Sequence, residues 1–284
     1  RLDRTRFKQV QWADARAEAD GDGSKEKPFG DLQKALAQLQ PGTLLQLRGG
    51  TYAGSFSMGR SGTAEEPIGI APVEGETVRL VLGHGIPRQD KNAPALRLMG
   101  CRHVIVHGLL LEGALGRDDE PENSFFSACG VVLTGGAGEG CVISGNIAYR
   151  HTHCGYKELG HGGTGFTMIG NVCFEIGQNS LDHGIYLPSS EARVIGNVIF
   201  RTSGLGVCAY SKPRQSVIER NVCWENKSAG ILVSGPENVV RHNTCVEPKS
   251  PLTLFRSDAK GNVVENNVLV GTKRFSMMVD NCGG

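Results

Sequence analysis

The sequence predicts an all-β solenoid, a fold in which each sequence repeat forms one coil of short strands. The first observation is a recurring phrase, in which an apolar pair and two loose residues precede an asparagine and an apolar run follows it. The second is the spacing of the copies, which is 25, 26, 24, 22 and 24 residues. The third is that each unit holds short β-branched runs separated by turns, without helical periodicity. The repeated asparagines are Asn146, Asn171, Asn197, Asn221, Asn243 and Asn267.

The repeated asparagine predicts how the coils are held together. A repeat of this length cannot bury its own apolar face and must stack on copies of itself. We expect each asparagine at a sharp bend between two strands, because Asn tolerates the left-handed backbone region and its amide can bond the turn. Stacked once per coil, the amides can also bond one another as a ladder. The residues two positions later are all apolar and should point inward: Ala148, Cys173, Ile199, Cys223, Cys245 and Leu269.

These repeats resemble the right-handed parallel β-helix of the pectate-lyase-like superfamily. That superfamily includes polysaccharide lyases, mannuronan epimerases, pectin-active hydrolases and phage tailspikes. The resemblance covers most of the chain, because the phrases at Asp22-Gly-Ser, Pro41-Gly-Thr and Gly50-Thr-Tyr are similar to the N-terminal entry of many bacterial β-helix enzymes. It implies coils of 22 to 26 residues, as the asparagine spacing gives.

One continuous repeat predicts a single β-helix domain over residues 1–284. Residues 1–42 should form a leader and a capping helix, and residues 43–284 the coils, of which the last is incomplete. The helix is expected over residues 28–40, with Asp31 at its start, and it would cover the open end of the solenoid. Its apolar stripe follows the i, i+3, i+4, i+7 pattern at Leu32, Ala35, Leu36 and Leu39.

The early coils are predicted from short apolar runs between turns. Two insertions interrupt the repeats: Gly116 to Ala128, which is acidic, and Arg150 to Thr164, which holds several histidines. Loops that protrude from a solenoid commonly form a wall of its binding face. The early strands are expected over residues 43–47, 68–71, 78–82, 95–99 and 104–111.

Composition excludes several classes of function. The formal net charge is +1, so the field of the whole molecule will not steer a polyanion, and no basic patch interleaved with aromatics indicates a nucleic-acid partner. No run approaches the apolar length of a membrane span, and the first 20 residues hold no apolar core of a signal peptide. The nine cysteines show no metal-binding or disulfide pattern. We expect a secreted or periplasmic bacterial protein whose signal peptide is not in this sequence.

A second strand in each coil predicts the outer face where chemistry would lie. Its apolar places alternate, so the places between them face outward. Lys157 fits the same face with a looser alignment. The first outward row is predicted to be Arg97, Val132, Tyr186, Cys208, Leu232, Leu254 and Met278. The next outward row includes Tyr210 and Arg256.

Polar side chains concentrate near the middle coils of this face, with Asp182-His183-Gly184-Ile185-Tyr186 as the densest piece. In mannuronan epimerases and related lyases a histidine near an aspartate on this face takes part in chemistry, and this stretch resembles that pattern loosely. The resemblance implies attack on a uronic acid, in which a base removes the C5 proton and an acid protonates the leaving oxygen. We expect His183 as base and Tyr186 as acid or its partner.

Cations and aromatic rings complete the predicted site. Lys157 and Arg256 are expected to neutralise the uronate carboxylate as part of the catalytic set. The partner would be an acidic polysaccharide or oligosaccharide. The residues predicted to bind it are Asp182, Tyr210, Lys212, His153 and Arg97.

The sequence leaves three functions open. We expect a polysaccharide lyase acting by β-elimination. A uronate C-5 epimerase would share the first step, removal of the C5 proton. A non-catalytic carbohydrate-binding or adhesion β-helix would need no proton-transfer residues. The histidine-rich insertion containing His151, His153 and His161 is a second candidate for a metal site, but no metal ligands are assigned. The cofactor is open between none and calcium, and the oligomeric state is undetermined.

Overall fold

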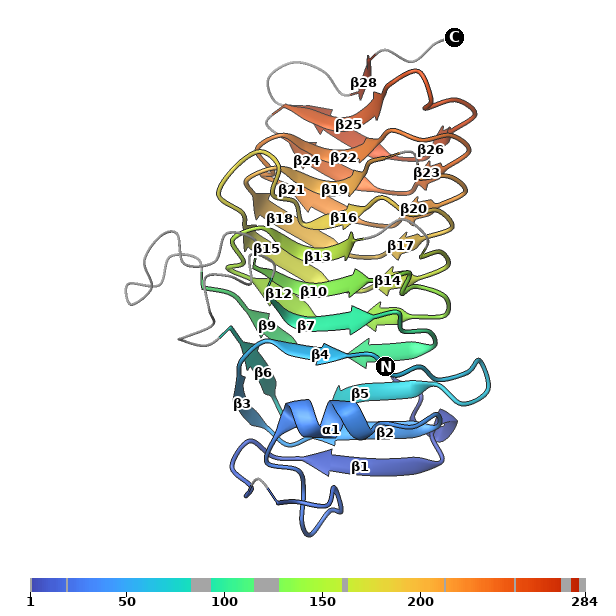
Figure 1. Ribbon diagram of the computed structural model, residues 1–284. Helices are drawn as coiled ribbons and strands as arrows, with labels where there is room; N and C mark the ends of the chain where they lie inside the picture. Colours follow the sequence, from blue (N-terminus) through green and yellow to red (C-terminus); the bar gives the residue numbers. More distant parts are fainter. Residues whose placement is uncertain are drawn as a thin grey trace.

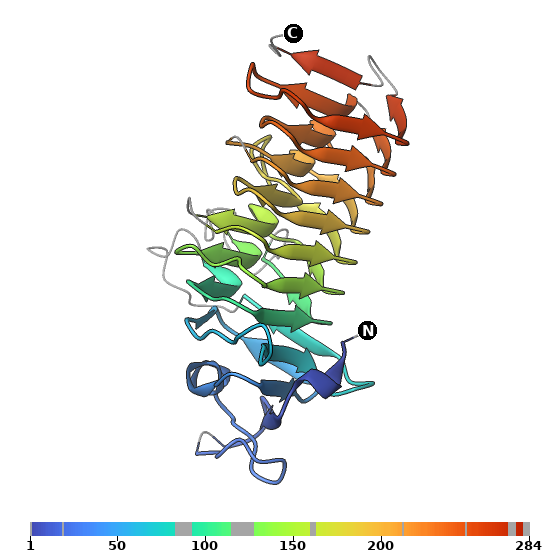
Figure 2. The ribbon, with the colours of Figure 1, turned by 90° about the vertical axis from the view of Figure 1, so that its right-hand side faces the viewer.

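The protein is a right-handed parallel β-helix, as a computed structural model describes it (Figure 1). The structure describes residues 2–18, 20–82, 93–114, 128–159, 163–211, 213–247, 249–271 and 277–280. Three parallel sheets run along the solenoid, and the described strands of each sheet pair in register with the coils before and after (Figure 2). The acidic insertion at Gly116 to Ala128 lies almost wholly outside the described residues. The fold predicted from the asparagine repeat is therefore confirmed.

The first sheet precedes the asparagine corner in every coil. Its first strand lies in the stretch that we expected to be leader, so the solenoid begins earlier than predicted. Its strands are β1 (Gln9–Ala13), β2 (Thr43–Leu47), β5 (Ile68–Pro72), β8 (Val104–His107), β11 (Val142–Ser144), β14 (Thr167–Ile169), β17 (Arg193–Ile195), β20 (Val217–Glu219), β23 (Val239–Arg241) and β26 (Val263–Glu265).

The second sheet follows the asparagine corner. Four aromatic rings stack on its outer surface, from Tyr149 through Phe174 and Phe200 to Trp224, with centroids 5.4, 5.1 and 4.2 Å apart. Their faces cover one another, so mainly their edges face outward. The strands are β3 (Gly50–Ala53), β6 (Val78–Val81), β9 (Leu110–Glu112), β12 (Ile147–Tyr149), β15 (Val172–Ile176), β18 (Val198–Thr202), β21 (Val222–Trp224), β24 (Thr244–Glu247) and β27 (Val268–Gly271).

The third sheet carries the face where the sequence placed the chemistry. In each of its middle coils, an outward-facing residue is followed by an inward-facing glycine. The residues after the glycine then alternate between inward and outward positions. At Gly184, for example, an added Cβ would lie 2.4 Å from Ile199 Cγ2 inside the tube, so only glycine fits. The strands are β4 (Phe56–Met58), β7 (Pro94–Met99), β10 (Cys129–Thr134), β13 (Cys154–Leu159), β16 (Ile185–Leu187), β19 (Leu205–Ala209), β22 (Ala229–Val233), β25 (Ser250–Phe255) and β28 (Met277–Asp280).

The N-terminal end is closed by a helix, as predicted. Helix α1 (Leu32–Gln38) is shorter than expected, and Asp31 caps it by accepting the backbone N–H groups of Gln33 and Lys34. Leu32, Ala35, Leu36 and Leu39 are all buried in the main core. A 3₁₀ turn, η1 (Arg4–Arg6), precedes β1. Within the described residues there is no helix long and apolar enough to cross a membrane.

The predicted asparagine ladder is present and buried. The Asn146 Nδ2 atom donates to Asn171 Oδ1 at 3.1 Å, and the same oxygen accepts the Asn146 backbone N–H at 3.0 Å. This pattern repeats in each coil down to Asn267. The predicted inward row is also confirmed, with Leu269 partly and the other members fully buried.

The origin of the bend differs from the expectation. The asparagine itself does not take the left-handed conformation; the residue immediately before it does, with φ between 53° and 63°. The asparagine can therefore turn its side chain inward, while its predecessor makes the bend. These left-handed residues are Gly145, Gly170, Gly196, Arg220, His242 and Asn266.

Two carboxylic acids are enclosed by the solenoid walls. Glu158 pairs in register with the core residue Leu133, and its side chain is buried. Among the described residues its Oε2 atom has no hydrogen-bond partner. Glu247 lies at the corner between the second and third sheets, where it accepts two hydrogen bonds from Asn226 at 2.7 Å. Burial raises the pKa of each carboxyl to about 7.

We predict that Asn197→Ala lowers the free energy of unfolding by about 3 kcal/mol. The change removes the acceptor of the Asn171 amide and the donor to the Met168 carbonyl, both of which are buried. Denaturant unfolding followed by circular dichroism measures the effect. The control is Arg193→Ala, an exposed position in the same coil. Equal stability of the two variants would show that the ladder is not stabilising.

We predict that the stability of the protein falls as the pH rises, and that Glu158→Gln reduces this fall. A folded-state pKa of about 7 lies above the ordinary value of 4.5, so the folded form binds more protons between these values and stability decreases with pH across them. Glutamine stays neutral, so the variant should gain up to about 3 kcal/mol relative to wild type at about pH 9. Unfolding at about pH 4 and about pH 9 tests this. The exposed variant Glu65→Gln should keep the wild-type slope.

Candidate functional site

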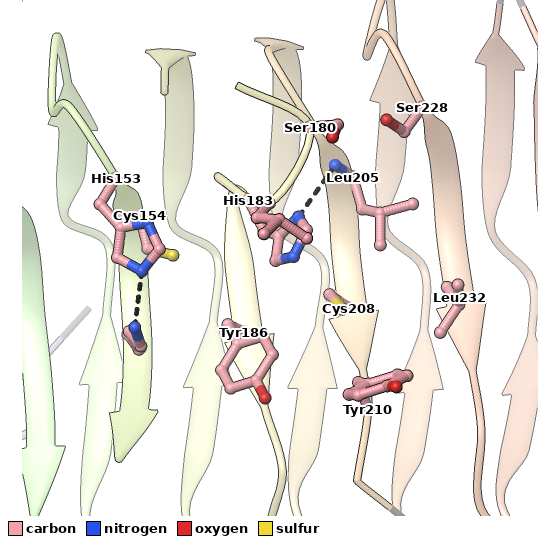
Figure 3. A pocket seen from close by; sticks show the side chains of 12 residues that line it. His153, Cys154, Ser180, His183, Tyr186, Leu205, Cys208, Tyr210, Ser228 and Leu232 are labelled. Carbon is pink, nitrogen blue, oxygen red and sulfur yellow. Dashed lines mark hydrogen bonds between the residues drawn. The ribbon is translucent and has the colours of Figure 1, made fainter. Parts of the chain in front are cut away.

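A cavity of about 530 Å³ opens on the outer face of the third sheet, over the coils that the sequence singled out. Strands β13, β16, β19 and β22 form its floor, and the loop before β16 forms one wall (Figure 3). Lys157, Tyr186, Cys208 and Leu232 are consecutive register partners and make one row along the floor. The lining residues are His153, Cys154, Lys157, Ser180, Leu181, His183, Tyr186, Leu205, Cys208, Tyr210, Ser228 and Leu232.

Three polar side chains form a hydrogen-bonded chain that begins at a buried carboxylate and ends in the cavity. Asp182 is buried, and its Oδ2 atom accepts the backbone N–H groups of Gln178 and Asn179 at 2.7 and 2.8 Å. Its Oδ1 atom lies 2.5 Å from His153 Nδ1. The other ring nitrogen of His153 lies 2.6 Å from Lys157 Nζ. The order Asp182, His153, Lys157 therefore runs from the buried backbone to the cavity.

The charge of His153 follows from its partners. Burial alone would lower the pKa of His153, but its hydrogen bond to Asp182 overcomes burial and raises the pKa to about 9. Burial likewise opposes ionisation of Asp182, yet the bonds from His153 and two backbone N–H groups hold its pKa below the ordinary value. Only one proton fits between His153 Nε2 and Lys157 Nζ. Because the pKa of His153 is raised, His153 holds this proton and its Nε2–H donates toward Lys157 Nζ.

His183 has a different environment although it adjoins Asp182 in sequence. It is buried, and its Nδ1 atom accepts the backbone N–H of Leu205 at 3.1 Å. Burial and the nearby His153 cation lower the pKa of His183 to about 4. The ring is therefore neutral at ordinary pH, with its proton on Nε2. It stacks against Tyr186 with ring centroids 5.8 Å apart.

Tyr186 lies on β16, and Tyr210 directly follows the neighbouring strand β19 (Figure 3). Tyr186 is half-buried, Lys157 Nζ lies 5.6 Å from its ring centroid, and burial raises the pKa of its phenol. Tyr210 follows β19, and Arg256 lies on the outer side of its ring, 4.5 Å from guanidinium carbon to centroid. The Arg256 guanidinium also donates to the Tyr210 hydroxyl.

The structure brings together five of the predicted site residues. His183, Tyr186, Lys157, His153 and Tyr210 all line the cavity, and Asp182 lies directly behind His153. The alignment of Lys157 with Tyr186 is confirmed by their register. The sequence did not predict the loop residues Ser180 and Leu181, nor that His153 connects Asp182 to Lys157.

Two predicted residues lie elsewhere, and a third is not described. Arg97 occupies the same row but is two strands from Lys157, beyond Val132, and does not line the cavity. Lys212 lies outside the described residues. Arg256 follows the end of β25 and approaches the cavity only through Tyr210.

The predicted alignment of the coil at residues 250–256 is wrong by one residue. Thr253, not Leu254, pairs with Leu232 in the outward row, and Leu254 pairs with the inward Val233. A shift of one residue exchanges the two faces of a strand. The cause is that Leu252 and Leu254 supply the inward apolar pair, which places Thr253 outside and Arg256 beyond the strand.

This architecture is a parallel β-helix of three sheets, with a cavity on one of them. The family model described as Periplasmic copper-binding protein (NosD) matches residues 120–283, more than half of the chain. The chain belongs to this family. It is also 25% identical over 202 residues to the uncharacterized protein YwoF of Bacillus subtilis (strain 168), covering 66% of this chain and 40% of that protein. The chain thus spans less than half the length of that curated relative.

Solved structures share the fold at low sequence identity. The pectate lyase Pel9A superposes with a TM-score of 0.66 at 13% identity, over 95% of this chain and 79% of that one. The alginate lyase from Paenibacillus sp. str. FPU-7 gives 0.59 at 15%, over 97% and 99%. A rhamnogalacturonan lyase gives 0.57 at 13%, over 91% and 87%. At these identities the likeness establishes the fold alone.

The described residues do not fit the copper in the family's description. Proteins hold copper with several nitrogen and sulfur ligands that converge on one point. Among the described ranges no group of three or more His, Cys, Asp or Glu side chains could hold a metal ion. His153, the imidazole nearest a carboxylate in the cavity, has both ring nitrogens engaged. The chemistry proposed for this site therefore uses no metal ion. The expected role of calcium stays a prediction.

We predict opposite titrations for the two cavity histidines. His153 should stay protonated until about pH 9, and His183 should stay neutral down to about pH 4. In Asp182→Asn, His153 loses its anionic partner while burial and Lys157 still oppose its charge, so its pKa should fall below the ordinary 6.5.

Imidazole resonances followed by NMR across the pH range measure both values. His107, which pairs with Ser144 on the first sheet, is the internal control and should titrate identically in wild type and variant. An unchanged His153 titration in the variant would mean that Asp182 does not set its charge.

Proposed function

We propose that the protein is a carbohydrate-active β-helix enzyme that cleaves a uronic-acid-containing polysaccharide by β-elimination. One observation carries the proposal: the Asp182–His153–Lys157 chain places an amine and a shared proton at the edge of a cavity of about 530 Å³, beside a tyrosine. Three solved structures with this fold, a pectate lyase, an alginate lyase and a rhamnogalacturonan lyase, support the same chemistry.

Lys157 is proposed as the base, in place of the histidine that the sequence favoured. When His153 carries the shared proton as an imidazolium paired with Asp182, the lysine is a neutral amine facing the cavity. To take the C5 proton, this amine gives up its bond from the His153 Nε2–H and turns its lone pair to the sugar; the proton moves to Nζ, and the Asp182 carboxylate paired with His153 offsets the positive charge that results. His153 and Asp182 act through Lys157 and are positioning residues.

His183 is proposed as a hydrogen-bond donor to the substrate. Its Nδ1 lone pair is already occupied by the Leu205 N–H, so this nitrogen cannot take a proton from the sugar without losing that bond. The remaining Nε2–H is available to the cavity. A donor there would stabilise the charge that develops on the C6 carboxylate as C5 is deprotonated.

Tyr186 is proposed as the acid, as the sequence suggested. Its raised pKa keeps the phenol protonated at neutral pH, and its ring lies on the strand between Lys157 and Cys208. In the elimination the C5–H bond gives its proton to the amine, the C4–O4 bond breaks, and a C4–C5 double bond forms. The leaving O4 takes the phenolic proton. Tyr210 offers a second ring for sugar contact.

A location outside the cytoplasm accords with this proposal. Polymeric uronates are substrates that a bacterium meets outside its cell membrane, and the family is described as periplasmic. We therefore propose a periplasmic or extracellular site of action.

We predict that incubation with a uronic-acid polysaccharide produces the ultraviolet absorbance of a conjugated double bond. Lys157→Met and Tyr186→Phe should each lower the rate at least about 100-fold, because each removes a proton-transfer group. The control Lys25→Met removes an exposed lysine beside Trp12, at the N-terminal end of the solenoid, and should keep the wild-type rate. Each polymer is tested with and without calcium.

The alternatives give different results in the same experiment. Full activity in both Lys157→Met and Tyr186→Phe would overturn the assigned site. Exchange of deuterium from solvent into the polymer, without new absorbance, would identify a C-5 epimerase. Saturable binding without either change would identify a carbohydrate-binding protein and contradict the proposed enzyme.

A further inference from the structure

The cavity floor is charged at one end and apolar at the other (Figure 3). Strand β13 contributes Lys157, and the residue just before that strand, His153, holds the lysine in the charged array. Strands β19 and β22 contribute Leu205, Cys208 and Leu232 to the opposite end. Lys157 is the only lysine or arginine among the described lining residues.

The two ends are separated along the axis of the solenoid. Lys157, Tyr186, Cys208 and Leu232 are register partners on four successive strands. Adjacent strands lie about 4.8 Å apart, so Lys157 and Leu232 are separated by about 14 Å. A pyranose residue in an extended polysaccharide advances the chain by roughly one such strand spacing. A bound chain running along the row would therefore place successive sugars over successive strands.

A fully ionised polyuronate does not suit this row. If one carboxylate is held at the end of the row where His153 and Lys157 share a proton, the next carboxylates along the chain would lie over Cys208, Leu205 and Leu232. An ionised carboxylate desolvated against apolar side chains without a cation is strongly disfavoured. Arg256 lies outside this row, 4.5 Å from guanidinium carbon to the Tyr210 ring centroid, and does not line the cavity.

Small apolar substituents suit the same surface. Leu205 and Cys208 form one apolar cluster on the outer face with Ala229, and Leu232 packs against it. Leu181, from the loop before β16, is 72% exposed and faces this side of the cavity. A methyl ester or O-acetyl group placed here would remove its own methyl group and these leucines from water together.

We propose, building on the proposed function, that the substrate is a partly esterified uronan. One free carboxylate occupies the Lys157 end, and sugars bearing methyl-ester or O-acetyl groups follow over β19 and β22. Leu205 and Leu232 determine this preference.

Calorimetry with the inactive Tyr186→Phe variant tests the proposal. The ligands are partly methyl-esterified polygalacturonate, partly O-acetylated polymannuronate, and the saponified form of each. We expect one esterified polymer to bind about tenfold more tightly than its saponified counterpart. Adding Leu232→Lys places a cation at the apolar end and should reverse the ratio. Adding Ile169→Lys instead, at an exposed apolar position on the first sheet, should leave it unchanged.

The outcomes separate this inference from the proposed function. Tighter binding of both saponified polymers, together with their cleavage by the wild-type protein, would overturn the ester preference and leave the lyase standing. Ester preference that Leu232→Lys reverses, without any cleavage, would support this subsite and overturn the lyase. A ratio that Leu232→Lys does not change would remove Leu232 from the subsite. Binding of none of the four polymers would overturn both.

Discussion

The structure depends on how the backbone is paired where the chain turns a corner inside a closed tube. Strand backbones form hydrogen bonds with the coils above and below. A corner interrupts these bonds and leaves backbone N–H and C=O groups buried without a strand partner. The asparagine amides supply the missing donors and acceptors, one per coil from Asn146 to Asn267. A left-handed residue before each asparagine makes the bend, so the amide is free to face inward. Stacking in one register then follows for all three sheets.

Fixed register is what gives the third sheet a usable outer face. Since each strand lies directly over the last, residues far apart in sequence form straight rows along the solenoid. The inward glycine at the start of each middle strand lets an additional residue face outward, as at Cys154, His183 and Leu205. A short loop is then enough to form a cavity wall. Asp182 in that loop accepts two backbone N–H groups and so anchors the polar chain that ends at Lys157 in the row.

The sequence was sufficient for the fold because the asparagine phrase and the inward apolar row repeat at one interval. It placed Lys157 and Tyr186 on the cavity floor because they fall on outward places of recognisable strands, and His183 and Tyr210 because they adjoin such strands. The sequence did not reveal that His153 connects Asp182 to Lys157. His153 and Asp182 are 29 residues apart and meet only when two coils stack. It misaligned Thr253 because two apolar residues flanking a threonine fit two registers equally well until neighbouring coils select one.

The aromatic stack on the second sheet also affects the intrinsic fluorescence of the protein. The chain contains two tryptophans, and they lie near different ends of the solenoid. Trp12, on β1, lies beneath the Arg48 guanidinium, whereas Trp224, on β21, lies 4.2 Å from Phe200 at one end of the aromatic stack. The indole emission of the folded chain is thus the sum of two local environments, one cationic and one aromatic. Unwinding that began at either end would alter one component before the other, so the solenoid carries its own spectroscopic indicator of direction.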